Sequence, residues 1–251
     1  MFYIRGLGVF SLGAPHLRRC DMRWPVSNSH PETELSPVVE VLNVAAVCHA
    51  TRALGPGLRS VVWVQGCPFR CPGCVAPDWV PIKPARLVDP TELAVELLAD
   101  PAVTGVTFSG GEPMLQASAL ARLARSLREM RDISIICFTG FQVDQLHKNP
   151  PGPGVPELME LLDVLIDGPY IERLNNNRGL RGSQNQRVLH LTNRLRDFDF
   201  ETGQRIAEVQ LKDGQVMMVG VPPARLRDAF NQAVDNANRL DTRGLLHHVR
   251  I

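Results

Sequence analysis

Short apolar strands that alternate with amphipathic segments are the feature that most limits how this chain can fold. The segments with the length and β-branched content of buried strands are 38–47, 60–65, 104–108, 133–138 and 164–166. The segments with the leucine spacing and start signals of helices are 89–100, 115–130 and 156–162. Strands joined by helices form βαβ units, so a parallel sheet covered by helices is predicted.

Four of these strands are followed at once by polar or metal-ligating residues, at Gly66-Cys67, Ser109–Glu112, Thr139-Gly140 and Asp167-Gly168. The carboxyl ends of parallel strands meet at one edge, and in a barrel they form the mouth at which the chemistry takes place. We therefore predict an α/β fold, and within it a partial TIM-like (β/α) barrel. An open doubly wound sheet is the alternative.

The chain divides into three predicted regions. Residues 1–36 mix Arg, Pro, Ser and His without sustained periodicity, and we expect a flexible N-terminal extension there. Residues 37–194 contain the alternating strands and helices of the core domain, and residues 195–251 form a C-terminal appendage. The appendage consists of a β-hairpin around an Asp-Gly turn and then an amphipathic helix, at 205–211, 215–221 and 222–240.

Charge and cysteine placement exclude several classes of protein. The 27 basic and 26 acidic residues leave a formal net charge of +1 without a dense Lys/Arg block, so nucleic-acid binding is not expected. The sequence has neither a run of about 20 apolar residues nor the apolar core of a secretory signal, which predicts a soluble cytoplasmic protein without membrane contact. In a chain of 251 residues of this kind, clustered cysteines indicate a metal or catalytic site rather than disulfides.

Three of the six cysteines lie within eight residues, in the segment Cys67-Pro-Phe-Arg-Cys71-Pro-Gly-Cys74. Thiolates bind zinc, copper(I) and iron-sulfur clusters, and an ordinary electron-transfer cluster uses four of them. A four-iron cluster held by this triad would keep one iron open to a substrate. Structural zinc with a distant fourth ligand and a cysteine loop without metal are the alternatives. The scattered cysteines are interpreted as buried small residues or free thiols, and these are Cys20, Cys48 and Cys137.

A series of short motifs runs along residues 40–190. The motifs are Gly55-Pro-Gly-Leu-Arg59, Trp63-Val-Gln-Gly-Cys-Pro68, Cys71-Pro-Gly-Cys74, Ser109-Gly-Gly-Glu-Pro113, Thr139-Gly-Phe141, Asp167-Gly-Pro-Tyr170 and Arg181-Gly-Ser183. Their order resembles that of the radical S-adenosylmethionine superfamily. Within the superfamily, the order is similar to that of the glycyl-radical-enzyme activases, and most similar to anaerobic ribonucleotide reductase activating proteins. The resemblance therefore implies an oxidoreductase that activates a glycyl radical enzyme.

The resemblance implies two cofactors, a 4Fe-4S cluster and S-adenosyl-L-methionine. Cys67, Cys71 and Cys74 would each ligate one iron, while the amino and carboxylate groups of S-adenosylmethionine would chelate the fourth. The reduced cluster would cleave S-adenosylmethionine to a 5′-deoxyadenosyl radical, which abstracts a hydrogen atom from the substrate. The protein then positions the sulfonium and keeps water and oxygen away, and no side chain is assigned a catalytic role.

The segment Ser109–Glu112 is implied to bind the methionine part of the cofactor. Gly110 and Gly111 would let the backbone approach it closely. Glu112 or nearby carbonyls would accept hydrogen bonds from its ammonium group, and Ser109 would add a hydroxyl. A Gly-Gly turn that only ends a strand is the alternative interpretation.

Two further strand-end residues, Thr139 and Asp167, match positions that line the cofactor site in the family and would contact ribose, the methionine carboxylate or a monovalent cation. Residues 181–187 would meet the nucleoside or the partner protein, with a solvated loop as the alternative. Two positions depart from the activase pattern, because Leu54 and Val75-Ala76 stand where activases often have Asp and Asn. Both lie near the expected approach of the substrate, so these departures leave open the identity of the protein that receives the radical.

The implied partners are a glycyl radical enzyme and an electron donor. Because one cysteine triad leaves no ligands for a second cluster, the electron has to come from outside, from a flavodoxin or a ferredoxin. A radical S-adenosylmethionine enzyme that modifies a peptide or small metabolite is the second hypothesis. A noncatalytic iron-sulfur or zinc protein used in electron transfer or scaffolding is the third, and it would not bind S-adenosylmethionine.

Overall fold

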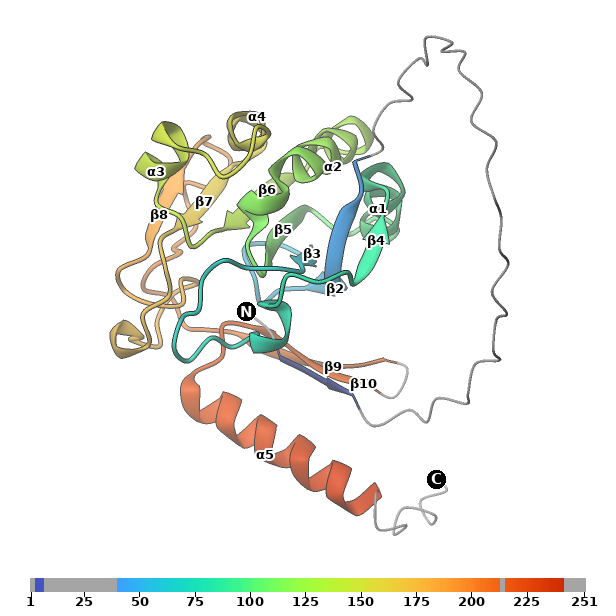
Figure 1. Ribbon diagram of the computed structural model, residues 1–251, viewed down its shortest axis with the longest axis vertical. Helices are drawn as coiled ribbons and strands as arrows, with labels where there is room; N and C mark the ends of the chain where they lie inside the picture. Colours follow the sequence, from blue (N-terminus) through green and yellow to red (C-terminus); the bar gives the residue numbers. More distant parts are fainter. Residues whose placement is uncertain (1–2, 7–39, 213–214, 242–251) are drawn as a thin grey trace, which may run out of the picture.

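The computed structural model describes residues 3–6, 40–212 and 215–241 (Figure 1). Its strands are β1 (Tyr3–Gly6), β2 (Leu42–Thr51), β3 (Arg59–Val64), β4 (Arg86–Val88), β5 (Gly105–Gly110), β6 (Ser134–Phe138), β7 (Val164–Asp167), β8 (Arg187–His190), β9 (Ala207–Lys212) and β10 (Gln215–Gly220). Its α-helices are α1 (Pro90–Leu97), α2 (Ala117–Met130), α3 (Val143–Lys148), α4 (Val155–Leu161) and α5 (Ala224–Asp241). Three short 3₁₀ helices span Pro77–Trp79, Pro113–Gln116 and Glu172–Leu174.

The central sheet has seven strands in the order β4-β2-β3-β5-β6-β7-β8. Strands β3, β5, β6 and β7 pair in parallel, whereas β2, β4 and β8 pair antiparallel to their neighbours. The prediction of an α/β fold with a largely parallel sheet is therefore confirmed. The parallel strands are the ones that the sequence pattern indicated, because runs buried on both faces are rich in β-branched residues.

The two faces of the sheet bury different side chains of the same strand. In β3, Val62 and Val64 belong to the core shared with α1 and α2, whereas Val61 and Trp63 belong to a second core on the opposite face. This division follows from the alternation of side chains along a strand. The second core also contains Val219 from the C-terminal part of the chain.

Helices α1 and α2 pack side by side over one face of the sheet (Figure 1). Helix α1 begins where its start signal predicted, because the Asp89 side chain accepts hydrogen bonds from the backbone N–H groups of Thr91 and Glu92. Helix α2 buries Leu120, Leu123 and Leu127 on the face that covers the sheet. The sequence interpretation did not predict α3, β4 or β8, which are short.

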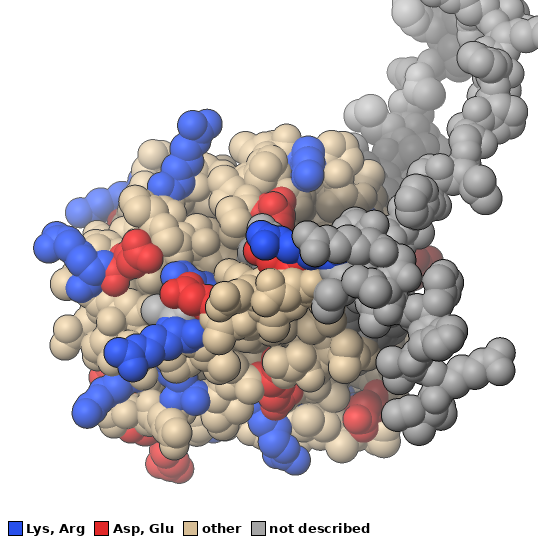
Figure 2. All heavy atoms as spheres, turned by 90° about the horizontal axis from the view of Figure 1, so that it is seen from below, with Lys and Arg blue, Asp and Glu red and all other residues tan. Residues whose placement is uncertain are grey.

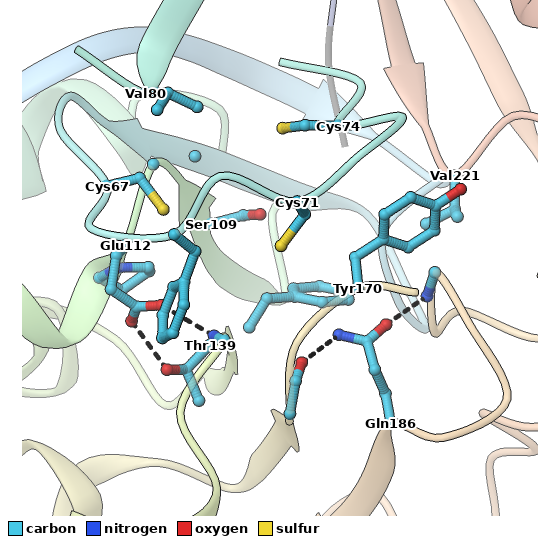
Figure 3. Close-up of a pocket in the computed structure, with 18 residues that line it drawn as sticks. Cys67, Cys71, Cys74, Val80, Ser109, Glu112, Thr139, Tyr170, Gln186 and Val221 are labelled. Carbon is cyan, nitrogen blue, oxygen red and sulfur yellow. Dashed lines mark hydrogen bonds between the residues drawn. The ribbon is translucent and has the colours of Figure 1, made fainter. Parts of the chain in front are cut away.

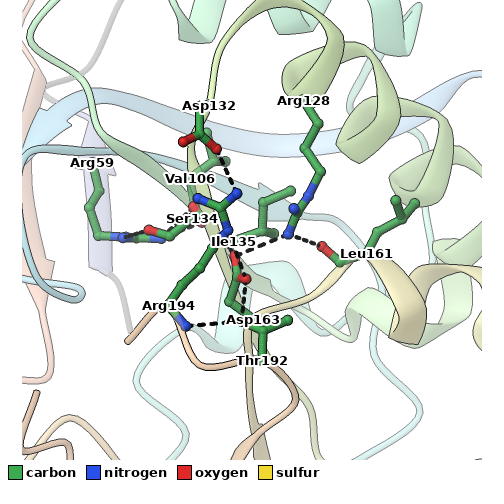
Figure 4. Close-up of polar contacts among 10 residues, drawn as sticks. All are labelled: Arg59, Val106, Arg128, Asp132, Ser134, Ile135, Leu161, Asp163, Thr192 and Arg194. Atoms are coloured by element: carbon green, nitrogen blue, oxygen red, sulfur yellow. Dashed lines mark hydrogen bonds and ion pairs between the residues drawn. The ribbon is translucent and has the colours of Figure 1, made fainter. Parts of the chain in front are cut away.

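Two buried polar networks tie the strands together at the ends from which the parallel strands begin (Figure 4). The Arg59 guanidinium is fully buried and donates to Thr107 and Ser134 side chains and to three backbone carbonyls. The Asp163 carboxylate is also fully buried and accepts from Ile135 N–H, the Thr192 hydroxyl and a guanidinium nitrogen of α2. The Arg59 guanidinium and the Asp163 carboxylate are therefore satisfied at this end of the sheet, whereas the buried Nε atom of Arg128 has no hydrogen-bond partner among the described residues.

The C-terminal part of the chain forms the predicted hairpin and helix. Strands β9 and β10 pair antiparallel, and β1 pairs with the other edge of β10, giving a three-stranded sheet in the order β1-β10-β9. Residues 213–214, the predicted turn, and 7–36, most of the predicted N-terminal extension, lie outside the described residues. Figure 1 shows this small sheet and α5 below the central sheet, next to the loop that follows β3.

The surface agrees with the balanced composition. Lys/Arg and Asp/Glu side chains are interspersed over the face shown in Figure 2, with apolar and uncharged residues between them. Within the described part of the chain, no helix has both the length and the apolar character needed to cross a membrane.

Candidate functional site

A pocket opens at the carboxyl ends of β3, β5, β6 and β7, opposite the closed polar end of the sheet (Figure 3). All four of the motif-bearing strand ends contribute to it, as the sequence predicted. It is lined by Cys67, Phe69, Cys71, Cys74, Val80, Ser109, Gly110, Gly111, Glu112, Pro113, Phe138, Thr139, Gly140, Gly168, Tyr170, Gly182, Gln186 and Val221. The structure therefore brings the three cysteines together with the Ser109–Glu112 segment and Thr139.

The cysteines lie on a loop, residues 67–80, that we call the cysteine loop. Its base is closed by a backbone hydrogen bond from Cys67 N–H to the Val80 carbonyl, 3.0 Å long. Its tip is a turn in which Cys74 N–H donates to the Cys71 carbonyl over 3.1 Å, with Pro72 and Gly73 at the central positions. Gly73 has φ +70°, as the third residue of a type II turn requires. The turn holds two thiols close to each other, and Figure 3 shows the three sulfur atoms around one shared space.

Phe69 anchors the cysteine loop to the end of β6. Its ring packs edge-on against Phe141, with centroids 4.9 Å apart. Its ring also fills the place where a Gly140 side chain would lie, because a Cβ there would come 2.6 Å from the ring. Neither a motif nor hydrophobic periodicity marks Phe69 as a site residue, so the sequence interpretation did not single it out. Its position between two ligand cysteines is the signal that was available.

The two glycines of the Ser109–Glu112 segment are required by close backbone contacts. A Cβ on Gly110 would lie 2.4 Å from the Val64 nitrogen, and one on Gly111 would lie 2.2 Å from the Gly66 carbonyl oxygen. The backbones are also hydrogen bonded, since Glu112 N–H donates to the Gly66 carbonyl over 2.8 Å. The glycines therefore seat this segment against the residue that directly precedes Cys67.

Glu112 is 1% exposed and its carboxylate is held by three internal donors. One oxygen accepts from Met114 N–H at 2.9 Å and from the Thr139 hydroxyl at 2.7 Å, and the other accepts from Gly140 N–H at 2.8 Å. Burial raises the pKa of Glu112 to about 7, although these hydrogen bonds oppose the shift. The carboxylate thus joins the segment after β5 to the segment after β6 on the pocket wall.

Thr139 and Ser109 lie on the pocket wall beside this carboxylate. The Thr139 hydroxyl donates to Glu112 and accepts from Phe141 N–H at 3.1 Å, so both of its functions are used within the protein. Ser109 is the residue of β5 that pairs with Trp63. Both predicted residues therefore reach the pocket.

Asp167 is placed differently from the other predicted residues. Its buried side chain accepts hydrogen bonds from the guanidinium of Arg187 on β8 and from Val143 N–H at the first turn of α3. The residue that lines the pocket at this strand end is its neighbour Gly168. A strand-end motif therefore does not by itself tell which of its residues faces the site.

The far wall of the pocket comes from the segment after β7 and from the loop before β8. The Gln186 side chain donates to the Gly168 carbonyl over 2.8 Å and accepts from Gly182 N–H over 2.8 Å. Tyr170 packs close to Gly182, where an added Cβ would lie 3.1 Å from the ring. The sequence interpretation assigned only a general contact role to residues 181–187, so Gln186 and Tyr170 are additions from the structure.

The C-terminal appendage also reaches this site. Val221, just after β10, lines the pocket. Arg227 on α5 donates to the Gly73 carbonyl over 3.3 Å and lies 4.0 Å from the Glu172 carboxylate. These contacts could not be predicted from the sequence, because nothing in the amphipathic pattern of α5 says which surface it covers.

Burial disfavours the ionised form of two of the three thiols in the metal-free protein. Burial raises the pKa of Cys67 to about 12, and burial together with the nearby Cys74 raises the pKa of Cys71, which Tyr170 N–H opposes. A bound metal centre would deprotonate such thiols. Among the described residues, no group of three or more His, Cys, Asp or Glu is placed to hold a single metal ion. A cubane cluster presents a different iron to each thiolate, so three thiols of one loop that surround a shared space fit it.

The remaining described cysteines lie elsewhere. Cys48 on β2 and Cys137 on β6 are buried and free of disulfides, as predicted, and Cys20 lies outside the described residues. Neither Cys48 nor Cys137 lines the pocket. The sulfur atoms that face the pocket are therefore those of the predicted triad.

An α/β fold with three cysteines on one loop at the carboxyl end of β3 has the ligand set of a metal-cluster protein. A family model described as a 4Fe-4S single cluster domain matches residues 53–189, which is more than half of the chain. The chain belongs to this family. The predicted 4Fe-4S cluster is thereby confirmed, and the matched region contains the cysteine loop and every other motif-bearing strand end.

The chain is also similar to named enzymes. Pyruvate formate-lyase-activating enzymes from Staphylococcus aureus strains USA300 and NCTC 8325 are each 44% identical to it over 75 residues. The similar region covers 28% of this chain and 30% of the length of each relative. This similarity confirms the predicted resemblance to the glycyl-radical-enzyme activases, and with the family match it supports S-adenosylmethionine as the second cofactor.

Proposed function

We propose that this protein is a radical S-adenosylmethionine enzyme that activates a glycyl radical enzyme. The observation that carries the proposal is the union of two motifs in one pocket. The cysteine loop and the Ser109–Glu112 segment line the same space and are joined by the backbone hydrogen bond from Glu112 to Gly66. A metal centre on the loop would therefore lie directly beside a wall suited to a small polar ligand.

Cys67, Cys71 and Cys74 would hold three irons of the 4Fe-4S cluster, and the fourth iron would face S-adenosylmethionine. When bound and reduced, the cluster would supply the one electron needed for reductive cleavage of a carbon–sulfur bond of the sulfonium. The task of the protein is to hold both groups in register. Phe69 and the turn at Pro72-Gly73 fix the loop, and the closed backbone around it leaves the thiols facing the pocket.

We propose that Ser109, Gly110, Gly111, Glu112 and Thr139 bind the methionine part of S-adenosylmethionine. Internal donors hold both carboxylate oxygens of Glu112 in a fixed orientation. The remaining lone pairs of these oxygens would accept hydrogen bonds from the ligand. Asp167 would act indirectly. Its hydrogen bonds with Val143 and Arg187 would fix the position of the end of β7, which carries Gly168. The wall formed by Tyr170 and Gln186 would then face the nucleoside.

The radical acceptor that we propose is a glycyl radical enzyme of the anaerobic ribonucleotide reductase type. The motif order supports it, and a partial, laterally open (β/α) barrel would let a loop of a large partner enter the pocket. A reducing cytoplasm suits free thiols of this kind. Leu54 and Val75-Ala76, which depart from the activase pattern, leave a peptide or a small metabolite as the second candidate substrate.

The first test is the cleavage of S-adenosylmethionine. The protein would be reconstituted anaerobically with iron and sulfide, reduced with dithionite, and assayed for 5′-deoxyadenosine by chromatography. We expect product from the parent and from Cys48→Ala, whose thiol is buried outside the pocket, and none from Cys71→Ala. A complete cluster that yields no product would contradict the proposal.

The second test concerns the acceptor. Anaerobic ribonucleotide reductase and pyruvate formate-lyase would each be added to the active mixture, and the glycyl radical detected by electron paramagnetic resonance. We expect a signal with the ribonucleotide reductase. Formation of 5′-deoxyadenosine without a glycyl radical on either protein would favour the peptide or small-metabolite alternative.

A further inference from the structure

The cysteine loop has two open faces. One is the pocket described above, and the other is a second hollow with a different set of further lining residues, which we call the outer hollow. The same three cysteines line both, together with Val80. The outer hollow is otherwise lined by Pro68, Arg70, Pro77, Pro81 and Ile82. A cluster bound to the three thiols would therefore be approachable from a side that the proposed S-adenosylmethionine wall does not occupy.

The outer hollow differs in chemistry from the inner pocket. None of its lining residues belongs to the Ser109–Glu112 segment or to the ends of β6 and β7. Its wall is apolar and rich in proline, which fixes the backbone without donating hydrogen bonds. The Ile82 side chain is 80% exposed, although isoleucine is among the residues most often buried in folded proteins. Arg70 is exposed and is the one charged residue that lines the hollow.

We propose that the outer hollow is the docking surface for the protein that reduces the cluster, a small acidic one-electron carrier. This inference rests on the proposed function, because only a redox centre at the loop needs such a donor. The step is the transfer of one electron from the reduced cofactor of the carrier to the cluster, and no bond is made or broken. The inner pocket would stay free for S-adenosylmethionine and the radical acceptor during the transfer.

Charge and size both fit this occupant. Arg70 carries a positive charge at the hollow, with no acidic residue in the lining to neutralise it, so a negatively charged carrier would be attracted and oriented there. Electron-transfer encounters use small, short-lived interfaces of less than about 1,200 Å². A rigid apolar patch around Ile82 with one cation meets that need. A carrier docked on this side would also come close to the thiolates themselves.

The test compares a protein reductant with a chemical one. Arg70→Glu reverses the charge at the hollow, and Ile82→Ser removes the apolar contact without changing charge. Lys148→Glu serves as the matched control, because it makes the same change of charge at an exposed residue of α3 outside the hollow. Cluster reduction would be followed by absorbance in stopped flow, with flavodoxin hydroquinone as the carrier and dithionite as the small reductant, at low and high salt.

We expect Arg70→Glu to lower the second-order rate of reduction by flavodoxin about tenfold or more at low salt, and less at high salt. Ile82→Ser should lower it several-fold, while Lys148→Glu should match the parent. At high salt, where the negative charge of dithionite is screened, reduction by dithionite and the 5′-deoxyadenosine formed with it should be the same in all four proteins. Equal rates with flavodoxin in the parent and in both hollow variants would overturn the proposed surface.

The failure of the two proposals can be told apart. If dithionite reduces the parent cluster but no 5′-deoxyadenosine forms, the proposed function fails. The docking surface is still judged by the rates of reduction by flavodoxin. If Arg70→Glu slows reduction by dithionite at high salt to the same extent as reduction by flavodoxin, the residue tunes the cluster and does not dock a carrier. That outcome would overturn the inference and leave the radical chemistry standing.

Discussion

The two ends of the same parallel strands are built in opposite ways. Where the strands begin, the Arg59 guanidinium makes five hydrogen bonds and the Asp163 carboxylate accepts from backbone, hydroxyl and guanidinium donors. Where they end, glycines bring backbones together and the thiols face an open pocket. One end consumes its polar groups internally, and the other keeps reactive groups available.

The difference shows how one sheet separates stability from chemistry. Burying a charge is tolerable when the charge is paired, so the closed end depends on the hydrogen-bond partners of Arg59 and Asp163. The open end tolerates unusual groups because the strands that carry them are fixed elsewhere. Glu112 is the exception, since it is a buried carboxylate of the closed type within the open end. Substitutions at each end should therefore have different consequences.

The largest effect is expected at the closed end. Asp163→Ala would leave Ile135 N–H and the Arg128 guanidinium without their buried acceptor, and should lower the free energy of unfolding by about 3–5 kcal/mol. Denaturant unfolding of the metal-free protein would measure it. Asp132→Ala is the matched control, because Asp132 also pairs with an arginine but is 81% exposed, and little change is expected. Similar losses for both variants would contradict the contrast between buried and exposed pairs.

The second effect concerns pH and Glu112. Burial raises its folded pKa to about 7 from an ordinary value of 4.5, so between these values the folded state binds more protons than the unfolded state. The stabilisation is complete below the lower value and is lost as pH rises through the higher one, with a slope of at most about 1.4 kcal/mol per pH unit.

The measurement is the unfolding free energy of the metal-free parent against that of Glu112→Gln across this range. Gln stays uncharged, so the part of the slope that belongs to Glu112 should be missing from the variant. Other titrating groups contribute equally to both proteins and cancel in the difference. Parallel stability curves for the two proteins would show that Glu112 does not titrate as expected.

The third effect is at the junction of the two motifs. Gly111→Ala would place a methyl group 2.2 Å from the Gly66 carbonyl oxygen and 2.9 Å from that of Trp79. The backbone has to move, at a cost of roughly 1–3 kcal/mol, and the cysteine loop moves with it. Iron and sulfide content after reconstitution should fall along with stability. Gly152→Ala is the control, because nothing lies within 4 Å of the added methyl.

The sequence predicted the positions of the strand ends well, but it did not predict the side-chain contacts between elements that are far apart in the chain. Hydrophobic runs and the Asp89 cap are local signals, so β3, β5, β6, β7 and α1 were predicted near their observed positions. The Cys67–Cys74 spacing likewise marked the site. Short elements such as α3 and β8 carry too few residues for a periodic signal. The Arg59 and Asp163 networks, like the packing of Phe69 on Phe141, join residues far apart in the chain, and no local pattern encodes them.

The smallest effect is expected where the appendage meets the cysteine loop. Arg227 contacts the Gly73 carbonyl and the Glu172 carboxylate from α5, and its side chain is 20% exposed. Arg227→Ala should change the unfolding free energy by less than about 1 kcal/mol, as exposed and half-exposed pairs do. It should nevertheless loosen the turn between two ligand cysteines, because contacts just outside a metal site orient its ligands.

Loss of iron to a chelator is the measurement that separates these two consequences of Arg227→Ala. We expect it to be about two- to tenfold faster in the variant than in the parent, with unchanged denaturant unfolding. Arg225→Ala, an exposed neighbour on the same helix, should behave as the parent. Faster iron loss only in Arg227→Ala would make α5 part of the open end of the molecule. Equal rates of iron loss in all three proteins would mean that α5 does not help to hold the cluster, and that the strand ends of the central sheet hold it without α5.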